Sequence, residues 1–284
     1  MSTHSIPSGS QVGKREPAPS TYAQTPGVLH FWLRRVHSLA GIVFGGYVAV
    51  HLTVNATGFA PKIYQMNVDK IHDLEPMLPL IEIIAIFTPL LIHLIYGAYI
   101  AKAGNKFNTM AYSYGGNVRY TLQRYTAFIL IAFVLYHIIT LHKWGLGQFK
   151  PENEAYQSTV VALKTPFGDL VAANIAIMIF YLLGIWSATF HLANGLWTAA
   201  IAWGVTTTQK SQRRWGHVCC ALGIGLTLVG TAAWVAFTIA GNPNLPISET
   251  FTKTHDEAVQ THDYKTGGGE KAKQPLVPDQ TPGK

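Results

Sequence analysis

The hydrophobic residues of the chain gather into five long segments, separated by connections in which charged and turn-forming residues concentrate. A helix needs about 20 apolar residues to cross a bilayer, and each segment reaches that length. The pattern therefore predicts an all-α integral membrane bundle of five transmembrane helices. The predicted spans are residues 33–57, 79–101, 122–141, 170–203 and 217–240.

Three of these segments have features that a plain span lacks. The first contains Gly41, Gly45 and Gly46, which would let a neighbouring helix or a flat ring approach closely. The second contains Pro79 near its start and Pro89 inside, so we expect a kink there. The fourth is longer than one span, and we expect it to tilt or to protrude from the bilayer.

The two ends of the chain have a different composition. Residues 1–28 are rich in Pro, Ser, Gly and Thr and lack the apolar core of about 7–15 residues that a signal peptide needs. We interpret them as a flexible cytoplasmic arm. Residues 241–284 have the composition of a disordered extracytoplasmic tail. The membrane domain is therefore predicted to cover residues 29–240.

The distribution of charge predicts how the bundle is oriented. The N-terminal arm, the connections 102–121 and 204–216 and the flanking span ends hold every arginine and only one acidic residue, Glu16. By the positive-inside rule this side is cytoplasmic, which places the N-terminus inside and the C-terminus outside. The net charge of +7 does not indicate nucleic-acid binding, because the positive residues sit at span ends and form no basic helix.

Four successive segments each carry a deep histidine: His51, His93, His137 and His191. A single buried histidine is most simply a hydrogen bond between helices, but one in each of four spans favours paired imidazole ligands of haem iron. A non-haem metal site would more often include carboxylates or thiolates. Adjacent cysteines at 219–220 give no metal-ligand spacing, and Glu82 is the only carboxylate inside a span.

Depth predicts how the four histidines pair. At a helical rise of 1.5 Å per residue, His51 and His137 lie about 20–24 Å from the inner boundary, whereas His93 lies about 14 Å from it. His191 also falls toward the inside, because its segment enters from outside. We therefore expect His51 and His137 to bind an outer haem, and His93 and His191 to bind an inner haem.

Two further polar residues are candidates for the chemistry around such haems. His37 shares a helical face with His51, 14 residues away, but no other span carries a second matching pair. We interpret it as a residue near the inner surface that contacts a haem propionate or a quinone, or that has only a helix-end role. Glu82, near the outer end of the second segment, is either a proton relay for an outer quinone site or an interfacial residue that begins the helix.

Four of the segments, in order, resemble the cytochrome b subunits of succinate dehydrogenase and fumarate reductase, in the type with one five-span polypeptide and two haems. The stretches that carry the resemblance are RRVHSLAGIV (34–43), VHLTVN (50–55), IEIIAIFTPLLIHLIYGAYI (81–100), LQRYTAFILIAFVLYH (122–137) and FHLANGLWTAAIAWGVTTTQKSQR (190–213). The last stretch is the most specific.

The resemblance implies the same ligand pairs: His93 with His191 for the haem b proximal to the partner subunits, and His51 with His137 for the distal haem b. In that family the histidine of RRVHS is not a ligand. It further implies a bacterial cytoplasmic membrane, a flavoprotein subunit that oxidises succinate, an iron–sulfur subunit, and a quinone, for which menaquinone is the expectation. The dicarboxylate chemistry would lie on the flavoprotein, because this chain has no dinucleotide-binding motif.

Two other functions remain open from the sequence. One is a di-haem cytochrome b that serves a hydrogenase or formate dehydrogenase; the other is a haem-free transporter or scaffold, although no inverted repeat supports it. The basic inner surface fits docking of an iron–sulfur subunit, while positive-inside bias with contact to anionic membrane lipid is the simpler reason for its charge. This surface consists of Arg34, Arg35, Lys102, Arg119, Arg124, Arg213 and Arg214.

Overall fold

The computed structural model describes residues 27–103, 115–142 and 149–245, and these residues form helices and connections without a strand. Among them, five helical segments are long and apolar enough to cross a membrane. The prediction of an all-α bundle with five spans is confirmed. The spans are Val28–Phe59, Leu78–Lys102, Gly115–Leu141, Val171–Ala202 and Gln209–Thr238.

The spans begin and end close to the predicted positions, with extensions at the polar ends. The predicted arm and tail lie outside the described residues, apart from residues 27–28 and 241–245. The elements in chain order are α1 (Val28–Ala56), η1 (Thr57–Phe59), α2 (Pro61–His72), α3 (Leu78–Ile81), η2 (Glu82–Phe87), α4 (Thr88–Ala103), α5 (Gly115–Leu141), α6 (Ala155–Lys164), α7 (Val171–Ala202) and α8 (Gln209–Thr238).

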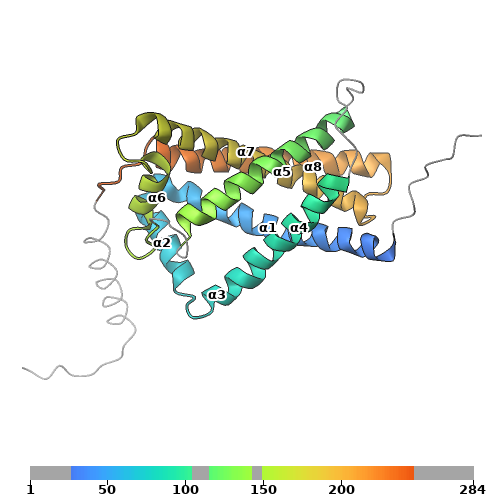
Figure 1. Ribbon diagram of the computed structural model, residues 1–284, viewed down its shortest axis with the longest axis horizontal. Helices are drawn as coiled ribbons and strands as arrows, with labels where there is room; N and C mark the ends of the chain where they lie inside the picture. The colour runs from blue at the N-terminus through green and yellow to red at the C-terminus, as the bar shows by residue number, and fades with distance from the viewer. Residues whose placement is uncertain (1–26, 104–114, 143–148, 246–284) are drawn as a thin grey trace, which may run out of the picture.

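Helix α1 is the central packing element of the bundle. It contacts α4, α7 and α8, whereas α5 packs mainly on α7 (Figure 1). The α7–α8 pair is the most extensive helix contact. Small residues permit the closest approaches: a Cβ added at Gly184 would overlap the ring of Phe133, and one added at Gly45 would overlap Leu192. Close backbone approach at small residues is how membrane helices gain packing contacts in a solvent as apolar as their side chains.

The second span is irregular where the prolines predict it to be. Pro79 lies in the first turn of α3, where its missing N–H costs nothing. Residues Glu82–Phe87 then form a π-helix, and α4 begins at Thr88, directly before Pro89. Proline inside a helix cannot donate to the preceding turn, and single π-helical turns occur where a regular ladder is interrupted. Glu82 is therefore the first residue of an irregular turn.

Two short helices outside the spans, which the sequence analysis did not predict, pack at one end of the bundle (Figure 1). Tyr64 of α2, Tyr156 of α6 and Phe237 of α8 form a buried aromatic cluster. Tyr64 shares a hydrogen bond of 3.1 Å with Thr159, and its burial raises the pKa of the phenol to about 12. We call α2, α6 and this aromatic cluster the end cap. It lies at the end of the bundle opposite the arginine-rich connections 102–121 and 204–216.

Candidate haem sites

The outer pair of histidines joins α1 to α5. The ring centroids of His51 and His137 lie 5.7 Å apart, with ring planes at 87°. The hydroxyl of Tyr47 lies 3.5 Å from Nδ1 of His51, one helical turn away. The ring of Phe133 lies beside His137, with centroids 5.7 Å apart. The two spans that carry the pair therefore converge at one depth.

The inner pair joins α4 to α7. The ring centroids of His93 and His191 lie 6.0 Å apart, with ring planes at 82°. The two pairs are separated along the bundle: Thr126, which contacts His191, and His137 are 11 residues apart on α5, or about 16 Å along the helix. The structure thus places the four histidines in two pairs, one that joins α1 to α5 and one that joins α4 to α7.

Backbone carbonyl groups fix the orientation of both inner histidines. Nδ1 of His93 donates to the carbonyl oxygen of His37 at 3.1 Å, and Nδ1 of His191 donates to the carbonyl oxygen of Gln123 at 3.2 Å. A carbonyl oxygen can only accept, so each Nδ1 carries the proton and each Nε2 keeps its lone pair. This is the arrangement in which a histidine binds a metal through Nε2 while a second group orients its ring.

The geometry of both pairs fits a haem iron. A metal–imidazole bond is about 2 Å long, so two ligand nitrogens on opposite sides of one iron lie about 4 Å apart, with the ring centroids somewhat further apart. No group of three or more His, Cys, Asp or Glu side chains able to hold a metal ion occurs within residues 27–103, 115–142 and 149–245. Two protein ligands per site suffice for haem, because the macrocycle supplies the other nitrogens.

The ring nitrogens of the outer pair are less completely hydrogen-bonded than those of the inner pair. Nδ1 of His137 is buried and has no hydrogen-bond partner within the described part of the chain, and Nε2 of His51 lies 3.4 Å from the side-chain amide of Asn55. An unpartnered buried imidazole nitrogen is costly. Nδ1 of His137 is therefore available to bond a further group, whereas both ring nitrogens of His51 already have protein contacts.

His37 belongs to the inner site. Its ring stacks on that of His93, with centroids 4.1 Å apart and planes at 12°. Its Nδ1 is buried and unpartnered within the described residues. Gly97 provides the space, since a Cβ there would lie 3.1 Å from Cε1 of His37. The ring therefore lies against His93 of the inner pair, where it is placed to contact a group that this pair would hold.

Glu82 has a partner that sequence reasoning missed. Its Oε2 lies 3.8 Å from Nε2 of His142, and both side chains are largely buried. His142 follows His137 by five residues, or about 7.5 Å along α5. From the sequence, His142 is a residue at a span end for which an interfacial role suffices. Only the packing of the second span beside the end of the third could identify it.

Gln123 is a second residue that the sequence analysis missed. Its side-chain amide donates to the carbonyl oxygen of His191 at 3.1 Å, and its side-chain carbonyl accepts from Asn194 at 2.9 Å. Thr126 adds a contact of 3.3 Å to Nδ1 of His191. The polar side chains of Gln123 and Thr126, at the start of the third predicted segment, were the sequence signal that could have indicated this contact. Together they join α5 to α7 next to the inner pair.

Two residues of the predicted basic surface are already engaged. Arg35 donates to the carbonyl oxygen of Ala202 at 3.3 Å, and Arg124 donates to that of Ala101 at 2.6 Å. Cations are favourable at helix C-termini, where the last carbonyl groups lack intrahelical partners. Part of the positive charge at this end therefore serves the bundle itself.

These observations define a five-span helical membrane protein with histidine pairs at two depths. The chain is 34% identical over 217 residues to the succinate dehydrogenase cytochrome b558 subunit of Bacillus subtilis (strain 168), over 74% of this chain and 98% of the relative. No protein-family model matches the chain. At this identity and coverage, the chain belongs to the family of succinate dehydrogenase cytochrome b558 subunits. The resemblance identified from the sequence is confirmed at the level of the family.

Proposed function

We propose that the chain is the membrane anchor and electron-transfer subunit of a succinate:quinone oxidoreductase. His93 and His191 would hold one haem b, and His51 and His137 would hold a second. Bound haem would supply one-electron iron centres at two depths, between an iron–sulfur partner and a membrane quinone. The presence of two histidine pairs on four different spans, about 16 Å apart along α5, is the observation that carries this proposal.

The chain's own residues would orient and shield these groups. The carbonyl groups of His37 and Gln123 hold the inner imidazoles with Nε2 free. His37, stacked on His93, would contact a haem propionate or a quinone at the inner level. The surrounding helices exclude water, and the dicarboxylate chemistry would take place on a separate flavoprotein subunit.

Quinone chemistry requires protons as well as electrons, because reduction of one quinone to quinol takes up two of each. Oε2 of Glu82 in the second span lies 3.8 Å from Nε2 of His142, which directly follows the third span and is five residues from His137 of the outer pair. An ionisable residue inside a membrane span is a functional candidate by default. We propose that this pair holds and transfers a proton at an outer quinone site, with menaquinone as the expected quinone and the N-terminal side of the bundle facing the cytoplasm.

The ratio of haem to polypeptide in the purified protein tests the proposal. We expect two b-type haems per chain by pyridine haemochrome assay, and a loss of at least one when His51, His93, His137 or His191 is changed to alanine. His217→Ala changes an exposed histidine in the third turn of α8; it is the matched control and should keep both haems. A wild-type protein without haem would contradict the electron-transfer role, and absence of flavoprotein and iron–sulfur subunits after mild purification would contradict the anchor role.

A further inference from the structure

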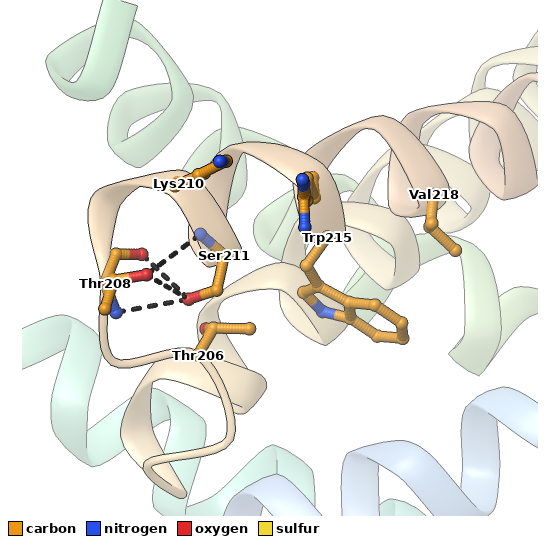
Figure 2. Close-up of a pocket in the computed structure, with 7 residues that line it drawn as sticks. Thr206, Thr208, Lys210, Ser211, Trp215 and Val218 are labelled. Atoms are coloured by element: carbon orange, nitrogen blue, oxygen red, sulfur yellow. Dashed lines mark hydrogen bonds between the residues drawn. The ribbon is translucent and has the colours of Figure 1, made fainter.

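A surface pocket of about 380 Å³ lies where the connection from α7 enters α8 (Figure 2), and none of the four paired histidines lines it. It is at the end of the bundle that carries the arginine-rich connections. Among its lining residues Arg214 belongs to the basic inner surface described above, and no haem or quinone role proposed above uses the pocket. Its lining consists of Thr206, Thr208, Lys210, Ser211, Arg214, Trp215 and Val218.

Thr206 provides the first indication that the pocket holds a ligand. The side chain is only 6% exposed, and its Oγ1 has no hydrogen-bond partner within the described part of the chain. Buried hydroxyl groups nearly always have a partner, and leaving one unpaired is costly. Thr206 lines the pocket, and rotation of its side chain to another staggered rotamer would turn this hydroxyl toward a polar ligand atom there, which would complete its hydrogen bonding.

Charge indicates that the ligand is an anion. Lys210 and Arg214 are four residues apart and lie on one face of α8, where two like charges repel each other. They also lie in the first two turns, where the helix dipole disfavours cations and favours anions. Neither side chain has a carboxylate partner within residues 27–103, 115–142 and 149–245. An anion between the two side chains would reduce both their mutual repulsion and their unfavourable interaction with the helix dipole.

The local capping of α8 leaves this face available. Thr208 and Ser211 satisfy one another as a capping box, in which Thr208 Oγ1 accepts from the Ser211 backbone N–H and Ser211 Oγ accepts from the Thr208 backbone N–H (Figure 2). The cap therefore needs no ligand of its own. Lys210, Arg214 and Thr206 remain with unused donors.

The rest of the lining is apolar and continues toward the membrane. The indole of Trp215 is fixed by a hydrogen bond of 3.2 Å from Nε1 to the carbonyl oxygen of Leu196. Val218, one turn further along α8, is 54% exposed. Tryptophan is enriched at the level of lipid headgroups. Donors at one end and an apolar wall at the other match a phosphate joined to a glycerol and acyl chains better than they match inorganic phosphate.

We infer that this pocket binds the phosphate of an anionic phospholipid in the membrane leaflet at this end of the bundle. Lys210 and Arg214 bind the phosphate oxygens, the hydroxyl of Thr206 donates a third hydrogen bond, and Trp215 and Val218 contact the glycerol and the first part of the acyl chain. The site differs from general attraction of lipid to a basic surface because it depends on one buried hydroxyl group and two particular cations.

Lipid titration followed by native mass spectrometry tests this inference. The full-length protein, with any co-purifying subunits, would be titrated in neutral detergent with phosphatidylglycerol. A basic residue near a membrane surface contributes about a fivefold gain in affinity, so Lys210→Gln with Arg214→Gln should weaken binding of the first lipid about 25-fold. Lys102→Gln with Arg213→Gln removes two charges from the same end outside the pocket, and should weaken it less than threefold.

Thr206→Val separates a ligand-binding role from a structural one. The change removes an unpaired hydroxyl, so the melting temperature without added lipid should not fall, while the affinity for phosphatidylglycerol should fall about fivefold. An equal loss of affinity in both double variants would overturn the inference in favour of general surface charge. Binding of inorganic phosphate to the pocket in place of the lipid would overturn it as well. So would a Lys210→Gln, Arg214→Gln variant that loses a co-purifying protein subunit but still binds the lipid normally.

Discussion

Nδ1 of His191 on α7 lies 3.2 Å from the backbone carbonyl oxygen of Gln123 on α5, and the side chain of the same glutamine binds Asn194. One residue of the third span therefore positions both a candidate haem ligand and the asparagine that follows it by three residues. The contact explains why the fourth span tolerates polar groups at depth: each has a partner on a neighbouring helix.

The coupling between Gln123 and Asn194 should be measurable by a double-mutant cycle. Gln123→Leu leaves the Asn194 amide without its partner and should cost about 1 kcal/mol of stability, whereas the double change to leucine should cost less than the sum of the single changes. Thermal unfolding of the haem-loaded protein measures these values. Strictly additive losses would show that the hydrogen bond contributes nothing.

Gly41 should control the inner site alone. A Cβ at this position would lie 2.6 Å from Nδ1 and Cε1 of His93, so Gly41→Ala must displace that ring. We expect loss or a spectral change of one haem, with the other retained. Gly46→Ala is the matched control on the same helix, because a Cβ there meets nothing within 4 Å. If both variants keep two unchanged haems, by pyridine haemochrome assay and redox titration, then the close approach of α1 to His93 has no role in binding.

Glu82→Gln should impair quinone reduction without loss of haem. The amide keeps the shape of the carboxylate but cannot carry the proton, and general acid–base groups contribute about 100-fold or more to rate. We expect succinate to reduce the haems normally while quinone turnover falls at least tenfold, with a similar effect for His142→Gln. Glu154→Gln, an exposed carboxylate paired with Lys150, should have no effect. Unchanged turnover in both test variants would exclude the proton-transfer role.

The end cap should lose stability at high pH through Tyr64. Burial raises the pKa of this phenol to about 12, above its ordinary value of about 10. The folded state therefore retains the proton that the unfolded state loses, and stability should decrease as the pH rises from about 10 to 12. Tyr64→Phe removes this term and should show a flatter profile at the cost of about 1 kcal/mol for the hydrogen bond to Thr159. Parallel pH profiles of melting temperature would contradict this account.

The sequence alone determined the number of spans and the helical class, because bilayer thickness requires long uninterrupted apolar runs. It also determined the family, because the stretches that contain the deep histidines resemble those of known cytochrome b subunits. It also predicted the depth of each histidine along its span, since a helix rises by a fixed amount per residue. The rotation of each helix about its axis is not set by length, so only the tertiary structure could decide which side chains meet across helices. That packing brings Glu82 to His142, Gln123 to His191 and His37 onto His93. It also decides that the connections 58–78 and 142–169 contain helices that bury Tyr64 and Tyr156 together, because their apolar faces are too short to be recognised until they pack against one another.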